Sequence, residues 1–362
     1  MVGAVLLAVG SGGCATILGE HQVASRTSLG SGSAEGATGS GGKLTSPAAK
    51  GSGRSKAQSG AGGGLAGVAN GAMFGGDLPL ASIAGQLGRK LAIVRVYDQL
   101  GEQFQNRQVD SLMANGTTVL VSIDTVPGQA SYASIAAGQH DQYFKGFLAS
   151  VEQAAVRYSL PAIYVAFEHE ADAAGHHQGL GTPAQFVQAW EHIHQLATSA
   201  HLDWNQGGRI HWVMIMTGAG YTKGFAGPFW PGTGEVDAVG VDAYNTGGCR
   251  IARKRHQRFT GALRPPVTPA SLFSAALQFA ADHGGLPVFV AEWGSVTYNT
   301  ATVRVNFIHQ MQAFVQANSA IAAALYWDSQ VPPCNYIIDN SAPSVAALAG
   351  MAQAPFMQGK PA

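Results

Sequence analysis

The sequence has little charge and no long apolar run, and both features narrow what the protein can do. Only 12% of its 362 residues are Asp, Glu, Lys or Arg, and 21 basic residues balance 21 acidic ones. Nucleic acids and anionic membranes select proteins with a basic excess, so the balanced charge argues against both partners. No stretch reaches the roughly 20 apolar residues that a membrane-spanning helix needs.

The first apolar stretch also lacks the Lys or Arg that normally precedes the core of a secretory signal. "MVGAVLLAVGSGGC" otherwise resembles such a core, and its end is similar to the bacterial lipoprotein motif, with Ser11 where that motif has Leu. We therefore expect residues 1–29 to be a signal- or lipoprotein-like segment, with a lipid anchor at Cys14. The protein would then be extracellular or attached to the cell surface. A buried N-terminal segment is the alternative.

Residues 30–65 have few large apolar side chains and consist mostly of Gly, Ser and Ala. Such a stretch cannot bury enough apolar surface to offset its ordering entropy, so it predicts a flexible tether. The remaining residues, 66–362, are long enough to bury a large core as one catalytic domain. We expect a monomer.

Short apolar runs alternate with longer amphipathic segments across this domain, including expected helices over 182–200 and 268–284. Apolar strands that alternate with helices form a parallel sheet covered on both faces. Eight such units in roughly 290 residues predict a (β/α)8 TIM barrel, because the chain lacks the glycine fingerprint of an open nucleotide-binding sheet. The expected strands cover residues 71–76, 91–97, 117–124, 162–168, 209–215, 236–244, 286–293 and 321–327.

The expected strands have apolar bodies and polar last residues. Catalytic groups of a (β/α)8 barrel lie at the carboxyl ends of its strands, so these polar residues predict an active-site rim. The rim residues are Arg95, Tyr97, Asp124, Glu168, His169, Glu170, Asp242, Tyr244, Glu292, Trp327 and Asp328.

Two strand ends carry a glutamate, in "AFEHE" (166–170) and "FVAEWG" (289–294). Glycosidic cleavage uses such a pair, one carboxylic acid to protonate the leaving oxygen and one carboxylate facing it. Glutamates after the fourth and seventh strands resemble clan A glycoside hydrolases, and the sequence His169-Glu170 resembles glycoside hydrolase family 26. "WPGTGEVDAVGVDAYN" (230–245) and "LPVFVAEWGS" (286–295) are similar to that family as well.

The resemblance implies a retaining, endo-acting hydrolase of a β-linked polysaccharide, with β-1,4-mannan favoured and no cofactor or metal. Glu170 would be the general acid/base and Glu292 the nucleophile. Arg95 would keep the nucleophile ionised, and Tyr244 would donate a hydrogen bond to it. His169 and Asp242 would lie in the sugar site, and Trp327 would form the floor under the cleaved sugar. Trp230 lies in a Gly/Pro-rich loop, where sugar stacking and core packing are equal alternatives.

Glu168 is the alternative acid within "AFEHE". In an extended strand Glu168 and Glu170 share one face, about 6.6 Å apart, with Glu170 at the mouth and Glu168 one layer deeper. Glu168 would otherwise be a buried, hydrogen-bonded carboxyl.

"ADAAGHHQG" (171–179) contains no aromatic residue, whereas the resembled family has a tryptophan-rich stretch there. This difference leaves β-glucan or β-xylan cleavage, or a non-catalytic carbohydrate-binding barrel, as alternatives. The histidines lack the spacing of a metal-binding HExxH helix, which favours solvated or sugar-contacting roles.

The three cysteines are an odd number for an exported protein. Cys249 and Cys334 lie in loops expected on the catalytic face, and an oxidising environment would pair them. Cys14 would then remain for lipidation or removal. Two small buried thiols are the alternative.

Overall fold

The computed structural model describes residues 69–361, apart from 105–106, 174, 176–178 and 250–263. The expected signal segment, the tether and Cys14 therefore lie outside the described residues. No helix within the described residues is long and apolar enough to cross a membrane.

Eight parallel strands follow one another around a closed sheet, in which the last strand pairs with the first. The predicted (β/α)8 barrel is confirmed, and each expected strand overlaps an observed one. A short strand, β11 (Gln358–Lys360), adds to the start of β1 in the antiparallel sense, and β9 (Gln330–Val331) pairs with β10 (Cys334–Asn335). The barrel strands are β1 (Ala69–Asp77), β2 (Ile93–Gln99), β3 (Thr118–Asp124), β4 (Ile163–Phe167), β5 (Ile210–Thr217), β6 (Ala238–Asn245), β7 (Val288–Ser295) and β8 (Ile321–Tyr326).

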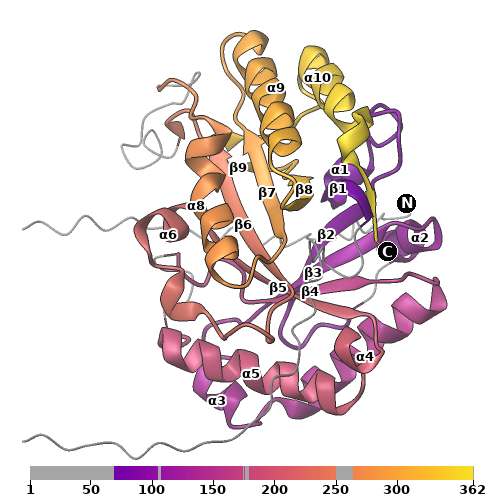
Figure 1. Ribbon diagram of the computed structural model, residues 1–362, viewed down its shortest axis with the longest axis vertical. Helices are drawn as coiled ribbons and strands as arrows, with labels where there is room; N and C mark the ends of the chain where they lie inside the picture. The colour runs from indigo at the N-terminus through magenta and orange to yellow at the C-terminus, as the bar shows by residue number, and fades with distance from the viewer. Residues whose placement is uncertain (1–68, 105–106, 174, 176–178, 250–263, 362) are drawn as a thin grey trace, which may run out of the picture. The chain divides into compact units, whose positions relative to one another are not determined.

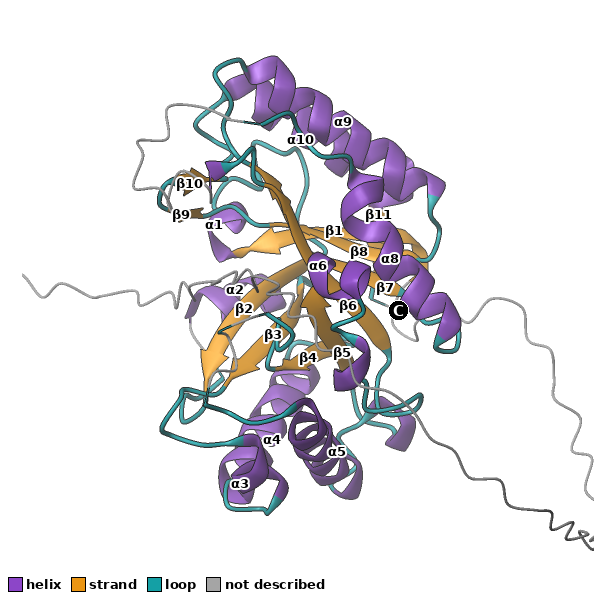
Figure 2. Ribbon diagram, turned by 90° about the vertical axis from the view of Figure 1, so that its left-hand side faces the viewer, coloured by secondary structure: helices purple, strands orange, loops and turns teal. Residues whose placement is uncertain are grey.

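Helices surround the barrel, with α3, α4 and α5 on one side and α8, α9 and α10 on the other (Figures 1 and 2). Both long helices expected from the sequence are present, and each starts at a threonine cap followed by proline, at Thr182 and Thr268. The helices are α1 (Leu78–Ala81), α2 (Arg107–Ala114), α3 (Tyr132–Ala136), α4 (Asp141–Arg157), α5 (Pro183–Ser199), α6 (Gly218–Lys223), α8 (Pro269–Asp282), α9 (Ala301–Ala317) and α10 (Ala342–Gln353), with 3-10 turns η1 (Trp204–Gln206), η2 (Gly227–Phe229) and η3 (Pro355–Met357).

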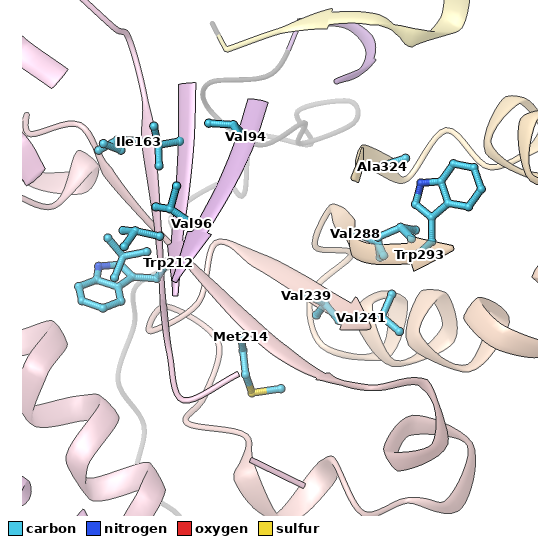
Figure 3. Packing of buried hydrophobic residues seen from close by; sticks show 14 of the residues in the cluster. Val94, Val96, Ile163, Trp212, Met214, Val239, Val241, Val288, Trp293 and Ala324 are labelled. Atoms are coloured by element: carbon cyan, nitrogen blue, oxygen red, sulfur yellow. The ribbon is translucent and has the colours of Figure 1, made fainter. Parts of the chain in front are cut away.

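The side chains of each strand alternate between an outer layer under the helices and an inner layer within the barrel. On β2, Val94 and Val96 belong to the outer layer, whereas Ile93 belongs to the inner one. Figure 3 shows outer-layer residues of several strands. Because successive strand residues face opposite sides, Arg95 and Tyr97 follow Ile93 onto the inner face, toward the carboxyl-end mouth of the barrel.

Strand β7 breaks this alternation next to Glu292, one of the two glutamates singled out in the sequence. Its pairing with β6 runs Val241 to Val290 and then Asp242 to Glu292, so Ala291 is an extra residue, a β-bulge. Ala291 lies in the inner layer and Trp293 in the outer one. Strict alternation from Ala291 would place Glu292 under the helices. The bulge instead turns this side chain to the interior, which is a common function of bulges beside active sites.

Cys249 and Cys334 form a disulfide, as predicted, with 5.3 Å between their Cα atoms. The bond links the segment after β6 to the β9–β10 hairpin after β8. It belongs to a small buried cluster with Val296 and Tyr336, against which Tyr244 and Trp327 pack. The disulfide therefore supports the aromatic side of the barrel mouth.

Candidate active site

Arg95 reaches across the barrel mouth from β2 to the carboxyl groups of β6 and β7. Its Nη1 lies 3.0 Å from Oδ2 of Asp242 and 2.9 Å from Oε1 of Glu292, and its Nε donates to the Ser122 hydroxyl at 3.1 Å. Only 1% of Arg95 is exposed. This buried guanidinium is in direct contact with Glu292, the position from which the predicted role of Arg95 on the nucleophile would be exerted.

Glu292 also accepts a hydrogen bond from the hydroxyl of Tyr97, again at Oε1. Sequence reasoning placed Tyr97 on the rim but gave it no role and expected this bond from Tyr244. The spacing of Arg95 and Tyr97 is the sequence feature that indicates this contact, because residues two apart on one strand face the same side.

Asp242 interacts electrostatically with both predicted catalytic glutamates. Burial raises its pKa well above the usual value, Arg95 opposes that rise, and the negative charges of Glu292 and Glu170 add to it. Since both charges act on this one buried carboxyl, Glu170 and Glu292 lie at the same mouth of the barrel. The structure thus brings together the two residues that the sequence selected.

The chain turns sharply at Glu168 and Glu170, both of which have a left-handed backbone, with φ of 51° and 55°. The amide of Glu168 donates to the carbonyl of Ile123 on β3, and that of Glu170 donates to Ile215 on β5. Strand β4 ends at Phe167, so the prediction that Glu168 and Glu170 share one extended face is wrong. A left-handed backbone at a non-glycine residue is unfavourable and is concentrated at functional sites.

Glu168 has a supporting position instead of a second catalytic one. Its carboxyl accepts bonds from the amide and hydroxyl of Thr125, and from the hydroxyl of Tyr132 at 3.5 Å. Burial raises its pKa, and the charge of Asp124 adds to the shift. Glu168 is 1% exposed and holds the loop after β3 against the start of α3, which matches the buried, hydrogen-bonded role.

The segment after Glu170 is tied to the end of β5. Asp172 accepts bonds from the Thr217 amide at 2.9 Å and the Thr217 hydroxyl at 2.6 Å. A Cβ atom at Gly220 would lie 1.4 Å from Oδ2 of Asp172, so only glycine leaves room for this contact. These bonds fix the chain two residues beyond the acid/base candidate.

His169 forms an ion pair with Asp124 at the end of β3, with 2.9 Å between Nδ1 and Oδ1. Burial disfavours the charged imidazolium, but the charge of Asp124 outweighs it and raises the pKa of His169 to about 9. The ring also lies 5.5 Å from that of Tyr97. A positively charged histidine therefore stands beside Glu170, within the predicted sugar site.

The replacement Asp124→Asn should lower the pKa of His169 below its usual 6.5, because burial then acts without the compensating charge. In the wild type, the folded-state pKa of about 9 exceeds the unfolded value. The pair therefore stabilises the fold fully below pH 6.5 and loses this effect as the pH rises to 9. Imidazole NMR titration checks the pKa, and urea unfolding at both ends of this range checks the stability. The exposed Asp282→Asn is the control, and an unchanged His169 titration in the Asp124 variant would contradict the assignment.

Aromatic residues line the barrel mouth at the ends of β6 and β8. The ring of Tyr244 lies 5.4 Å from that of Trp327 and 5.2 Å from that of Tyr336. Trp327 is partly exposed, and its amide donates to the carbonyl of Trp293, next to Glu292. This placement suits Trp327 as a sugar floor.

Asp77, at the end of β1, is a rim residue that sequence reasoning missed. It accepts a bond from the amide of Asp328 at 3.0 Å. Burial, with added repulsion from Asp328 and Glu292, raises its pKa to about 7. No motif marked it, because it follows a strand of small residues.

Trp230 lies away from this mouth, so of its two alternatives the structure shows core packing and not sugar stacking. Its ring packs on Phe279 and His283 at the C-terminal end of α8. In this fold a helix runs back from the carboxyl ends of the strands, so its C-terminal end is at the opposite end of the barrel. The Gly/Pro-rich loop around Trp230 is a connection leading into β6.

The histidines of the "HH" pair, His176 and His177, lie outside the described residues. Among the residues that the structure does describe, no three His, Cys, Asp or Glu side chains form a metal-binding group.

Several solved structures that share this architecture are glycoside hydrolases. An endo-β-1,4-mannanase double mutant of Cellulomonas fimi matches with a TM-score of 0.54 at 15% identity, over 79% of this chain and 71% of that one. A family 26 β-mannanase of Bacteroides ovatus matches with a TM-score of 0.54 at 10% identity, over 79% and 90%. The chain shares the barrel fold of these family 26 enzymes. The resemblance seen in the sequence is thereby confirmed at the level of the fold.

A second glycoside hydrolase family shares this architecture. A family 5 broad-specificity endoglucanase of Clostridium longisporum matches with a TM-score of 0.53 at 12% identity, over 76% of this chain and 85% of that one. No protein-family model and no curated protein sequence matches the chain.

Proposed function

We propose that the protein is a secreted, retaining, endo-acting glycoside hydrolase that cleaves a β-linked polysaccharide, with β-1,4-mannan as the favoured substrate. The observation that carries the proposal is the environment of Glu292. A buried arginine and a tyrosine hydroxyl both bind its carboxyl, and Glu170 stands at the same barrel mouth. The fold shared with family 26 mannanases supports the same reading.

Each glutamate has one role in this proposal. Glu170 protonates the oxygen of the leaving sugar while Glu292 attacks the anomeric carbon, which gives a glycosyl-enzyme. Glu170, now ionised, then takes a proton from water as the water displaces Glu292. Two inversions at one carbon retain its configuration. Proton NMR of the first-formed product, before mutarotation, tests the stereochemistry.

The choice of substrate depends on the groups at the barrel mouth. Trp327 and Tyr244 offer aromatic surface for a sugar ring, and Asp77 and His169 offer polar groups for its hydroxyls. These groups suit a neutral polysaccharide of several kinds. The similarity to a family 5 endoglucanase makes β-glucan the second candidate, and β-xylan remains a third.

Reducing-end release from a panel of polysaccharides separates these candidates. We expect β-1,4-mannan to be cleaved faster than mixed-linkage β-glucan or β-xylan. A higher rate on either of the other two would mean that this polysaccharide, and not mannan, is the preferred substrate. The two-glutamate mechanism would be unaffected. Binding of a polysaccharide without any release would favour a non-catalytic barrel, and the Glu292→Ala variant serves as the blank.

Export belongs to the proposal and rests on the sequence alone. Residues 1–29 would direct the chain out of the cell, and Cys14 would carry a lipid if the motif around it is processed. The tether over 30–65 would then hold the catalytic domain away from the membrane surface.

A further inference from the structure

Two side chains from one strand converge on one oxygen of Glu292, one by an ion pair and one by a hydrogen bond. Nη1 of Arg95 lies 2.9 Å from Oε1, and the hydroxyl of Tyr97 donates to the same atom. Both side chains come from the inner face of β2, which β1 and β8 separate from β7 in the closed sheet. Neither the ion pair nor the hydrogen bond involves Oε2.

The ring of Tyr97 is held in place on two sides. The guanidinium carbon of Arg95 lies 4.9 Å from its centroid, and the ring of His169 lies 5.5 Å away. Burial of the hydroxyl raises the pKa of Tyr97 well above its usual value, so the phenol remains a donor. The side chain is nevertheless 38% exposed, which means that it also borders the open mouth.

We propose that Tyr97 is a positioning residue which, together with Arg95, occupies Oε1 of Glu292 and so makes Oε2 the oxygen that attacks the sugar. This inference rests on the proposed function, because it requires Glu292 to be the nucleophile. It assigns to β2 the hydroxyl that the family resemblance assigned to Tyr244 on β6.

The bonds to Oε1 act differently in the two steps. In the first, Oε2 bonds to the anomeric carbon, the bond to the leaving oxygen breaks, and Glu170 gives that oxygen its proton. In the second, water bonds to the same carbon, the bond to Oε2 breaks, and Glu170 takes the water proton. The electron pair of the broken bond returns to the carboxylate of Glu292, where the ion pair with Arg95 and the hydrogen bond from Tyr97 stabilise the charge. Loss of one donor should therefore slow the second step more.

The replacement Tyr97→Phe tests this assignment, because it removes the hydroxyl and keeps the ring between Arg95 and His169. A hydrogen bond to a charged group contributes roughly 1.5–3 kcal/mol, so we expect kcat to fall about 10- to 100-fold. The donor stabilises the charged form of the nucleophile, so its loss should move the acid limb of kcat/KM to higher pH.

An aryl glycoside with a good leaving group reports on the second step. With the wild type its release should be linear, whereas with Tyr97→Phe one equivalent of phenol per enzyme should appear in a burst. The control is Tyr143→Phe, which removes a hydroxyl that donates to the carbonyl of Gln99 at 3.2 Å, at the end of the same strand. This control should keep the wild-type rate and acid limb.

Two results would overturn the proposal. An unmoved acid limb in Tyr97→Phe is one, and a loss confined to KM is the other. If Glu292→Ala stays active, the proposed function itself fails; if that variant is inactive and Tyr97→Phe behaves as wild type, only the positioning role fails. Should the phenylalanine variant not fold, 3-fluorotyrosine at this position provides a stronger donor of the same shape. The acid limb should then move to lower pH, and a limb that stays in place would count against the proposal.

Discussion

Glu292→Ala should abolish turnover on every polysaccharide that the wild type cleaves, because it removes the attacking carboxylate. Arg95 and Tyr97 would then face a cavity in place of Oε1. A small anion such as azide can enter that space, attack from the same side and yield a glycosyl azide of inverted configuration. Product analysis by NMR with and without azide checks both expectations.

Glu170→Ala should produce a different defect, because it removes the proton donor and leaves the nucleophile. General acid catalysis typically contributes about 10²- to 10⁴-fold, so the loss should be of this size on polysaccharide. On aryl glycosides with acidic leaving groups the first step should recover. Glycosyl-enzyme should then accumulate, since Glu170 also activates water, and mass spectrometry of the quenched enzyme detects it.

Glu168→Ala is the matched control for Glu170→Ala. Its carboxyl is buried and binds Thr125 and Tyr132. We expect a loss of stability from the freed polar groups and no dependence on the leaving group. If Glu168→Ala shows that dependence while Glu170→Ala stays active, the assignment within "AFEHE" is wrong. If neither Glu170 nor Glu292 matters, the enzyme proposal fails.

Arg304→Met should cause a large loss of stability, although Arg304 lies outside the catalytic groups. Arg304 lies on α9, is 1% exposed, and donates to the side chains of Asn340 and Tyr326, both at 2.9 Å. It also donates to the carbonyls of Tyr336 and Ile337. The replacement leaves several buried acceptors without a donor, and each costs about 1–3 kcal/mol.

Urea unfolding should therefore show a decrease of about 3–5 kcal/mol in the free energy of unfolding of Arg304→Met. The exposed Arg157→Met, at the end of α4, is the matched control and should change it by less than about 0.5 kcal/mol. Because Arg304 holds the segment that follows Trp327, KM for long substrates should rise as well. An Arg304 variant as stable as the control would mean that the disulfide and backbone bonds hold this segment alone.

The barrel and its rim follow from local patterns in the sequence. Eight apolar runs spaced by amphipathic segments allow few other folds, since parallel strands must be covered on both faces. The rule that catalytic groups lie at carboxyl ends then gives the rim without any knowledge of distances, and the family resemblance singles out Arg95, Glu170 and Glu292 within it. The pairing of Cys249 with Cys334 followed from their loops, because both loops lie at the same end of the barrel.

Only the tertiary structure decided how these residues meet. Glu292 faces the interior because Ala291 is an extra residue in β7, and a bulge of one residue leaves no mark in an apolar run. Glu168 and Glu170 do not share an extended face, because their amides donate to different neighbouring strands. Contacts between segments far apart in the chain bring Tyr97 to Glu292 and Asp77 to Asp328, and they pack Trp230 on Phe279. Local patterns determine which elements form and where they end, whereas contacts across the barrel determine which side chains share a site, and these depend on strand register and packing.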